Sequence, residues 1–538
     1  MDTETKRRFY PSLVLDYQEG KGDVREFYNA HFKDIEDYQY KYSWLLESYP
    51  ACNREVMVKS LQKFNQSLGS RGKTLENIAL LREKDTAAVV TGQQAGILTG
   101  PLYTIYKATA AVKLAQKLSR AGMKAVPVFW IASEDHDFQE VSSIIIQGQD
   151  GVPKKLEMEG SSSGHSVEKV FLSGGEIASL IAGIEKETPA TEYKEEVMQT
   201  IRDTALEGES LVRWFARLMT RLFKDTGLVL FNPLHPEIRN LAPELLSSIC
   251  LQGEEINSIL SHREKELEDK GYHLQVEREE GHLNLFASLE GGRAALFNKN
   301  GRVVTRQGEE LGRLEKVAET MKQKPGQFGP GVLTRPLLQE VFLPALSYVA
   351  GPAELSYFPQ LMPLYNHFNL KPPVLYPRPS LTLVEPRMRR YLDKYSLSSS
   401  DLFRLGDARV EFLQKRGKSD LEEAFQRLEG LIAEEYASLA DLLSGIEKGL
   451  VDLSQKNLGR VMKEVGYLKK KAEESLNNKH KTAVNHFNTL ENSVLPRGDL
   501  QERKYNILTY LIKYGPAFLD RLLEEFPLEA DHHFFDVN

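Results

Sequence analysis

The chain has 538 residues, so two or three domains, or one large domain with insertions, are expected rather than a single compact core. Its formal net charge of −7 argues against a nucleic-acid partner, although a local basic pocket for a phosphate is compatible with it. The two cysteines, Cys52 and Cys250, exclude a disulfide framework and a cysteine-built zinc site. Both are expected to be small buried side chains. Without an apolar run of about eighteen residues or a secretory signal, we expect a cytoplasmic protein with no membrane partner.

The first part of the chain, to about residue 80, carries amphipathic patterns that predict helices. Apolar runs of strand length follow. They do not alternate with polar residues, which is typical of a parallel sheet covered on both faces by helices. A helical pattern at Leu102–Leu118 follows the first run, and this alternation predicts a doubly wound α/β core. The predicted strands are Ala87–Val90, Ala125–Ala132, Gly227–Phe231, Val374–Tyr376 and Leu381–Val384.

Two segments interrupt this pattern, at about 147–224 and about 254–327, and are expected to be insertions in a core that spans residues 1–390. The first insertion starts with glycine, serine and charged residues and continues with helices around Glu192–Phe223. The second contains GHLNLFASLEGGRAALFNKNGRVV, in which glycines at turn positions predict a β-hairpin.

From Leu421 to Leu453 the apolar residues recur at intervals of three and four, which is a heptad pattern with one stutter. A second helical run, rich in lysine and glutamate, follows it. An antiparallel helical hairpin or coiled coil is therefore predicted in a domain at 391–495. It would serve either as a dimerisation arm or as an intramolecular bundle on the core. Residues 496–538 are expected to form a helical segment that packs back on the core.

The stretch TGQQAGILTGPLYTIYKA follows the first predicted strand. Its glycines allow turns or a close approach of the backbone, and a helix that begins after Pro101 would direct free N–H groups at the cleft beyond the strand ends. This pattern favours a phosphate or carboxylate there; the alternative is a tight loop whose glycines only serve packing. Gln94 is a candidate catalytic residue, and the candidate substrate-binding residues are Thr91, Gln93, Thr99, Gly100, Tyr103 and Lys107.

The second predicted strand runs into WIASEDHDFQE, where acidic residues crowd together. Like charges so close repel each other unless a cation, a basic group or a proton compensates them. The segment could hold Mg²⁺ beside a nucleotide, contact a substrate amine or use its histidine as a base; the alternative is a helix N-terminus decorated with acids. We expect it to converge with the glycine-containing loop on one cleft. The candidate catalytic residues are Glu134, Asp135, His136 and Asp137.

Three later segments add polar side chains. YVAGPAELSYFPQL places Glu354 and Tyr357 on one helix face, as candidates for substrate binding. YPRPSLTLVEPRMRR supplies Arg378 for an anion and, in a basic cluster, Arg387 for a phosphate or as part of a solvated helix end. LPRGDLQERKYN could serve a nucleotide or tie the helical arm to the core. The candidate cofactor-binding residues are Arg387, Arg503, Tyr505 and Asn506.

These segments, in this order and over essentially the whole chain, resemble the BshC family, the cysteine-adding enzymes of bacillithiol synthesis. The resemblance implies a ligase that joins L-cysteine to glucosaminyl-malate. It also implies a Rossmann-like core like that of the class I aminoacyl-tRNA synthetases and nucleotidylyl transferases. Connecting-peptide insertions would interrupt this core, and the coiled coil would form a homodimer.

An amine does not condense usefully with a free carboxylate in water, so the resemblance implies that the cysteine carboxylate is activated, by ATP with Mg²⁺, as an adenylate. The loop Gly92–Tyr103 would then hold the nucleotide or the malate anion, and the acidic segment the amine or the metal. However, TGP stands where such synthetases carry a histidine-containing signature. An alternative therefore places the nucleotide at a second site near Arg503 and Tyr505, with ADP as product. Further alternatives are a different amine acceptor and a non-catalytic nucleotide-binding scaffold that acts through its coiled coil.

Overall fold

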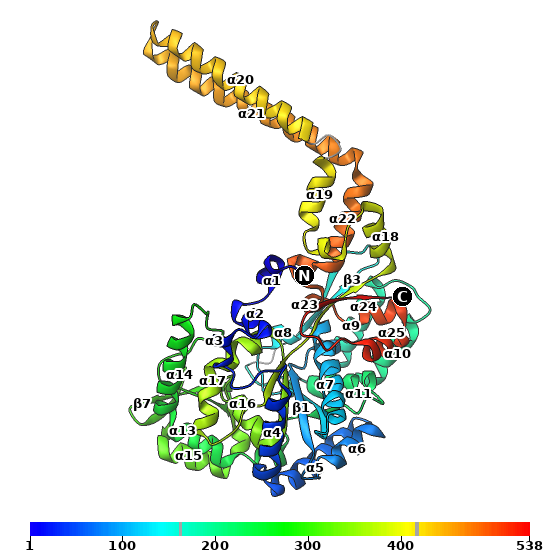
Figure 1. Ribbon diagram of the computed structural model, residues 1–538, viewed down its shortest axis with the longest axis vertical. Helices are drawn as coiled ribbons and strands as arrows, with labels where there is room; N and C mark the ends of the chain where they lie inside the picture. Colours follow the sequence, from blue (N-terminus) through cyan, green and yellow to red (C-terminus); the bar gives the residue numbers. More distant parts are fainter. Residues whose placement is uncertain (161–163, 415–418, 538) are drawn as a thin grey trace. The chain divides into compact units, whose positions relative to one another are not determined.

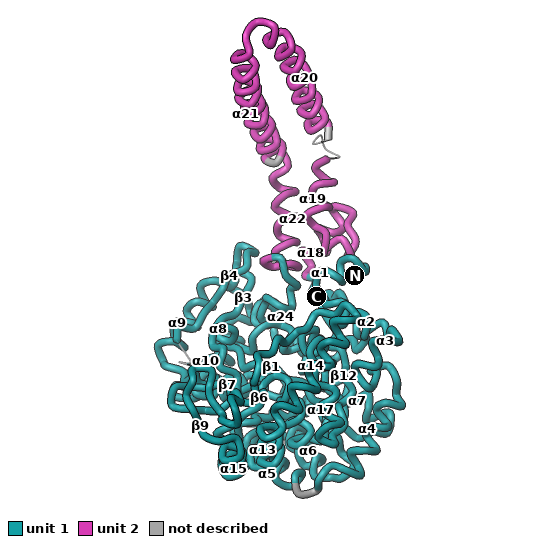
Figure 2. The backbone as a smooth tube through the Cα atoms, turned by 90° about the vertical axis from the view of Figure 1, so that its left-hand side faces the viewer, with its two compact units in different colours: residues 1–384, 498–538 teal, residues 385–497 magenta. Residues whose placement is uncertain are grey.

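The computed structural model describes residues 1–160, 164–414 and 419–537, and the chain divides into two compact units (Figure 2). One unit comprises residues 1–384 and 498–538, and the other residues 385–497. Cys250 is buried, and burial raises the pKa of its thiol to about 12, whereas the side chain of Cys52 lies outside the described part. No described helix is both long and apolar enough to cross a bilayer.

The first unit is built around a five-stranded sheet in which all neighbouring strands are parallel. Every residue of the strand Ala125–Ile131 is buried. The helix α7 (Leu102–Arg120) packs against this strand and against the strand Ala87–Gln93 (Figure 1), as the unbroken apolar runs predict. The prediction of an α/β core is confirmed. In spatial order the strands are β12 (Val374–Pro377), β11 (Ala345–Ala350), β1 (Ala87–Gln93), β2 (Ala125–Ile131) and β5 (Val229–Phe231).

The chain order of these strands reverses at β1. From β1 the sheet grows through β2 and β5 on one side, whereas β11 and β12 lie on the other side. The topological switch point therefore lies between β1 and β11, and in open α/β sheets ligands bind beyond the carboxyl ends of the strands at this point.

Two strands differ from the sequence prediction. β11 was not predicted, because its apolar run was considered only as the lead into Gly351 and Pro352. The strand predicted at Leu381–Val384 exists as β13 (Ser380–Val384) but pairs in parallel with β14 (His532–Asp536), outside the central sheet. Pro377 and Pro379 explain the difference, since residues without an N–H cannot continue the ladder of hydrogen bonds.

The two predicted insertions have different architectures. The first begins within an antiparallel hairpin, whose strand β3 (Ser143–Gln147) precedes the predicted bounds and whose strand β4 (Pro153–Glu157) lies inside them, and it continues with the helices α9, α10 and α11. In the second, the predicted hairpin is confirmed as β6 and β7, but it extends to a five-stranded antiparallel sheet in the order β10-β6-β7-β8-β9. These strands are β6 (His282–Leu289), β7 (Gly292–Lys299), β8 (Arg302–Thr305), β9 (Glu310–Arg313) and β10 (Phe328–Pro330).

Helices surround the two sheets, and the helical prediction for the first part of the chain is confirmed by α1 to α6. The helices are α1 (Thr3–Phe9), α2 (Ser12–Glu19), α3 (Gly22–Arg25), α4 (Ile35–Ser48), α5 (Ala51–Ser67), α6 (Lys73–Leu80), α8 (Phe138–Val141), α9 (Gly174–Glu187), α10 (Lys194–Thr204), α11 (Leu211–Leu222), α12 (Pro236–Arg239), α13 (Pro243–Leu251), α14 (Gly253–Asp269), α15 (Leu314–Gln323), α16 (Arg335–Phe342), α17 (Pro352–His367), α23 (Gln501–Lys504), α24 (Leu508–Tyr514) and α25 (Pro516–Glu525).

The second unit is helical, and α20 runs antiparallel to α21 as a hairpin (Figure 1). The heptad pattern was expected to continue to Leu453 along one helix, but the chain turns at residues 445–447, so Leu450 and Leu453 belong to α21. Ile446 lies in the turn and is 74% exposed. The helices are α18 (Pro386–Tyr395), α19 (Leu405–Leu413), α20 (Ser419–Ser444), α21 (Lys448–Lys479) and α22 (Lys481–Val494).

Candidate active site

A cleft of about 760 Å³ lies at the carboxyl edge of the central sheet. Gln94 follows β1, Asp135 follows β2, Glu354 follows β11 and Arg378 follows β12, and all four line the cleft. Parallel strands end at one edge of a sheet, so residues far apart in sequence meet there. This cleft is the candidate active site.

Gln94 joins the loop after β1 to the acidic segment after β2. Its side-chain Nε2 donates to Asp135 Oδ2 and to Glu140 Oε2, each at 2.6 Å. Asp135 is oriented from its other oxygen, since Oδ1 accepts from the backbone N–H of His136 at 2.7 Å. The expected convergence of the two segments on one cleft is therefore confirmed. A neutral amide between two carboxylates fixes both of them without neutralising either.

Lys107 and Glu354 form an ion pair at the switch point. Lys107 Nζ lies 2.6 Å from Glu354 Oε2 and donates to the carbonyl oxygen of Gly92 at 2.8 Å. Glu354 also accepts from the N–H of Gly351 at 2.6 Å and from the hydroxyl of Tyr348 at 2.5 Å. Burial lowers the pKa of Lys107, and the carboxylate of Glu354 opposes this shift. The pair thus joins the end of β1 to the start of α17.

Gly92 is the glycine of this loop whose small size the sheet requires. A Cβ atom at this position would lie 2.9 Å from the carbonyl oxygen of Trp130 and 3.2 Å from Trp130 Cβ. The close approach lets the end of β1 pair with β2 up to the contact between Gln93 and Ile131. The glycine therefore has a packing role in addition to its place on the cleft wall.

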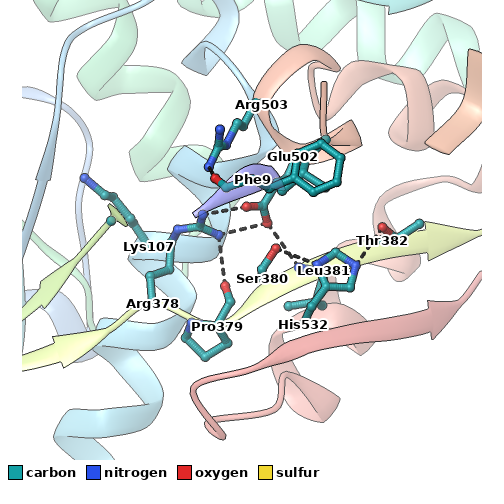
Figure 3. Close-up of polar contacts among 12 residues, drawn as sticks. Phe9, Lys107, Arg378, Pro379, Ser380, Leu381, Thr382, Glu502, Arg503 and His532 are labelled. Atoms are coloured by element: carbon teal, nitrogen blue, oxygen red, sulfur yellow. Dashed lines mark hydrogen bonds and ion pairs between the residues drawn. The ribbon is translucent and has the colours of Figure 1, made fainter. Parts of the chain in front are cut away.

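Arg378 is held by the C-terminal segment (Figure 3). Its Nη1 and Nη2 donate to the two carboxylate oxygens of Glu502 at 2.9 and 2.6 Å, and both side chains are almost completely buried. Glu502 also accepts from the N–H of Leu381 at 3.1 Å. Burial raises the pKa of Glu502, but the charge of Arg378 and these hydrogen bonds outweigh it, so the pKa lies below its ordinary value. The pair stays ionised and fixes the guanidinium in the cleft wall.

The C-terminal segment also supports the loop after β1. Asn506 Nδ2 donates to the carbonyl oxygens of Leu98 and Gly100 at 2.7 and 2.5 Å. Leu98 and Thr99 have positive φ angles of 50° and 76°, which side chains rarely adopt without such support. The N–H of Leu102 donates to the carbonyl oxygen of Tyr505 at 2.8 Å. This N–H, expected to be free for an anion, is therefore already bonded within the protein.

Some of the remaining candidates of the loop after β1 line the cleft, and others do not. Thr91 is buried in the sheet, where its Oγ1 donates to the carbonyl oxygen of Val349 at 2.9 Å. Burial raises the pKa of Tyr103 to about 12, so its hydroxyl on the cleft wall stays protonated. The predicted residues that line the cleft are Gln93, Gln94, Tyr103, Lys107, Asp135, Glu354, Tyr357, Arg378 and Arg503. Those that do not are Thr91, Thr99, Gly100, Glu134, His136, Asp137, Tyr505 and Asn506.

Within the acidic segment, Glu134 and Asp137 bond to other parts of the protein and do not line the cleft. Glu134 forms an ion pair with the buried guanidinium of Arg239. The carboxylate of Asp137 caps α8, as the alternative interpretation of this segment expected. Only Asp135 of this group faces the cleft. Arg387 belongs to the second unit, where its Nε donates to the hydroxyl of Tyr391 at 2.9 Å.

Several cleft residues were not selected from the sequence. Arg335, at the start of α16, lies 5.5 Å from the ring centre of Trp130 and 5.3 Å from that of Tyr348. Glu140 is the last residue of the acidic segment WIASEDHDFQE and meets Gln94 from the short helix α8. No local motif marks Arg335, because the rings that it contacts belong to strands of the central sheet.

The lining of the cleft carries charges of both signs. Asp135 and Glu140 contribute carboxylates, and Arg378 and Arg503 contribute guanidinium groups, beside Arg335 and the ion pair of Lys107 with Glu354. Among the described residues, no three or more His, Cys, Asp or Glu side chains form a group that could hold a metal ion. A metal ion that arrives with a nucleotide would meet two carboxylates that already accept from Gln94.

Comparison with known proteins gives matches over almost the whole chain. Residues 1–379 match the family described as "Bacillithiol biosynthesis BshC, N-terminal Rossmann-like domain", and residues 381–537 match "Bacillithiol biosynthesis BshC, C-terminal coiled-coil domain". Relatives named "Putative cysteine ligase BshC" include proteins of Desulforamulus reducens and Symbiobacterium thermophilum, each 34% identical over 94% of both chains. A relative of the same name from Bacillus cereus is 29% identical over 97% of both chains.

Proposed function

Because the chain belongs to the BshC family of bacillithiol biosynthesis, we propose that it is a cysteine ligase that joins L-cysteine to glucosaminyl-malate. The observation that carries this proposal is that one cleft carries charges of both signs. The carboxylates of Asp135 and Glu140 suit a substrate amine, and the guanidinium group of Arg503 suits an anion, whereas Arg378 is already paired with Glu502. An amine and an activated acid would then bind in the same cleft.

The proposed reaction needs a leaving group on the cysteine carboxylate. An oxygen of this carboxylate attacks a phosphorus atom of ATP. Attack at the α-phosphate releases pyrophosphate and gives an adenylate, whereas attack at the γ-phosphate releases ADP and gives an acyl phosphate. The sugar amine then attacks the activated carbonyl carbon, and AMP or phosphate leaves as the amide forms. Both routes use the same amine, so the same carboxylates would serve either.

The protein's own residues would contribute position and proton transfer. Gln94 holds Asp135 and Glu140 at 2.6 Å each, so that one of them can accept the proton that the amine loses when it becomes nucleophilic. Arg503, which also lines the cleft, would stabilise negative charge that develops at the activated group, and Arg378, paired with Glu502, would keep the cleft wall in place. Tyr103, which stays protonated, can donate a hydrogen bond to the same group.

We further propose a homodimer through the helical hairpin of α20 and α21. The hairpin leaves large apolar side chains exposed, among them Leu442 at 70%, Leu453 at 60% and Leu468 at 58%. Such exposure along a heptad pattern is typical of an interface with a second coiled coil.

The test uses the purified full-length protein with L-cysteine, glucosaminyl-malate, ATP and Mg²⁺. Mass spectrometry should detect the cysteine-containing sugar, and chromatography of the nucleotides shows whether AMP or ADP accompanies it. Asp135→Asn should lose most of the product formation. Asp137→Asn is the matched control, because Asp137 lies outside the cleft and asparagine also caps a helix well. Absence of product with every nucleotide, or equal loss in both variants, would contradict the proposal.

A further inference from the structure

A second cavity, of about 370 Å³, adjoins the cleft. One of its walls comes from the antiparallel sheet of the second insertion, including His282, Phe286 and Arg293, and another from the end of β2. Its volume is near the lower end of the range for small-molecule sites, and the main cleft is about twice as large. The residues that line both cavities are Trp130, Ala132, Asp135, Val276, Val332 and Arg335.

Four arginines line this cavity, and they differ in how their charge is compensated. Arg278 forms an ion pair with Glu264, and Arg306 forms one with Glu279. In the part of the chain that the structure describes, the other two, Arg293 and Arg335, form no ion pair with a carboxylate. The cavity therefore offers two guanidinium groups that no carboxylate of the described residues pairs with directly, although the negative charge of Asp135 acts on Arg293 and that of Glu354 acts on Arg335.

Arg293 is held by an aromatic ring, a backbone carbonyl and an imidazole. Its guanidinium carbon lies 3.8 Å from the ring centre of Phe286, and its Nη2 donates to the carbonyl oxygen of Pro330 at 2.7 Å. Its Nη1 lies 3.5 Å from Nδ1 of His136. Burial lowers the pKa of Arg293 to about 10, and the negative charge of Asp135 opposes this shift. An oriented guanidinium with this little compensation favours binding of a carboxylate or phosphate oxygen.

Arg335 is fixed in the wall that the two cavities share. Its ring contacts are with Trp130 and Tyr348, and its Nη1 donates to Gln339 Oε1 at 3.3 Å. His282, the first residue of β6 in the antiparallel sheet, adds an uncharged imidazole, since burial lowers its pKa to about 4. The cavity thus combines these two cations with aromatic and neutral polar groups and with the carboxylates of Glu134, Asp135, Glu277 and Glu279. Two of these carboxylates are paired with arginines, Glu134 with Arg239 and Glu279 with Arg306.

We propose that this second cavity binds the carboxylates of the malate half of glucosaminyl-malate, with Arg293 and Arg335 as the recognition residues. This inference rests on the proposed function. The only carboxylate of cysteine must react, and two arginines would stabilise its charge and oppose its activation. Malate keeps two carboxylates that take no part in the reaction, because the sugar amine is the nucleophile. The sugar would then extend past Asp135 into the main cleft, where the amine meets the activated cysteine.

The test compares two arginines of the same cavity in the full-length protein. Titration calorimetry measures the binding of glucosaminyl-malate to the wild type and to Arg293→Gln and Arg306→Gln. Arg293→Gln should weaken binding by about tenfold to a hundredfold, the range for a hydrogen bond to a charged group. Arg306→Gln is the matched control, because it removes the same charge from an arginine that Glu279 already compensates, and it should change binding less than about threefold. Equal weakening in both variants would overturn the inference.

Two further measurements identify the ligand and keep the test valid if a variant does not fold. L-malate should compete with glucosaminyl-malate for the wild type but not for Arg293→Gln; stronger competition by inorganic phosphate than by L-malate would overturn the assignment to carboxylates. Arg293→Lys keeps the positive charge but lacks the planar guanidinium that binds a carboxylate through two hydrogen bonds, so it should show an intermediate affinity. It replaces Arg293→Gln in the test if that variant does not fold.

Product formation separates the two proposals. If the wild type forms the cysteine-containing sugar while Arg293→Gln binds the acceptor as tightly as the wild type, the inference fails and the proposed function stands. If L-malate binds in an Arg293-dependent manner but no product forms, the carboxylate site is supported and the proposed function fails.

Discussion

Asn506→Ala tests whether the C-terminal segment shapes the loop on which the site depends. The substitution removes the two bonds that Nδ2 donates to the carbonyl oxygens of Leu98 and Gly100, and the bond that Oδ1 accepts from the N–H of Leu508 at 2.9 Å. Asn506 is completely buried, so three backbone groups lose their partner. At about 1 kcal/mol each, the lower value for an unsatisfied buried group, the loop loses about 3 kcal/mol of local stability.

Hydrogen exchange measured by mass spectrometry gives the required local readout, because global unfolding of a chain with two units is not a two-state process. A loss of about 3 kcal/mol should accelerate exchange in peptides that cover residues 96–104 by about a hundredfold. These peptides include the N–H groups of Gly100 and Leu102, which are hydrogen-bonded in the folded loop. Asn485→Ala, at an exposed position, is the control and should leave them unchanged. Unchanged exchange in Asn506→Ala would refute the reasoning.

Three further predictions concern turnover, pH and assembly. Gln94→Ala should lower kcat/KM by about a hundredfold, because a small displacement of catalytic groups lowers the rate on this scale, and it should leave the thermal unfolding unchanged. An activity equal to that of the wild type would show that the loop of Gln94 is not part of the active site. Burial lowers the pKa of His532 to about 4, whereas in the unfolded chain it titrates near 6.5. The stability that His532 gives to the first unit should therefore fall by about 3 kcal/mol between pH 6.5 and pH 4 and level off below it. His532→Asn should show less of this loss in the unfolding midpoint of that unit, and an unchanged pH dependence would exclude His532 as its source. Glutamate at both Leu439 and Ile446 should convert the proposed dimer to a monomer in light scattering, and an unchanged mass would favour an intramolecular bundle.

Much of the central sheet is predictable from local pattern. β2 and the first four residues of β1 are apolar and buried because helices cover both faces of the sheet, and the glycines after Val90 indicate where the apolar run ends. Because parallel strands end at one edge of the sheet, the same pattern predicts that Gln94 and Asp135 lie at that edge. The cleft between them follows from the parallel direction of the strands.

Long-range pairing is the part that the local pattern does not contain. β13 is as apolar as a core strand, but it pairs with β14, and paired residues such as Val384 and Asp536 lie 152 positions apart in the sequence (536 − 384). A local pattern does not reveal a pairing over such a distance. Glu502, Asn506 and Tyr505 act on the site from a segment that is distant in sequence. Their side-chain types are compatible with ligand binding and with structural support, and only the bonds to Arg378 and the loop decide between these roles.

The acidic segment shows why residue type and position alone do not assign a role. Four adjacent polar residues were expected to act together, but Glu134 bonds to Arg239 and Asp137 caps α8. Side chains that follow a strand diverge as soon as the chain turns, so only one of the group reaches the cleft. Arg335 shows the converse, since it enters the cleft from a helix whose sequence carries no motif.

The central claim is that one cleft at the carboxyl edge of the sheet holds the reacting groups. A crystal structure of the protein with glucosaminyl-malate and a non-hydrolysable ATP analogue tests it most directly. We expect the sugar amine within hydrogen-bonding distance of Asp135 or Glu140, with the malate half toward Arg293. A sugar bound away from the loop of Gln94 would contradict the account.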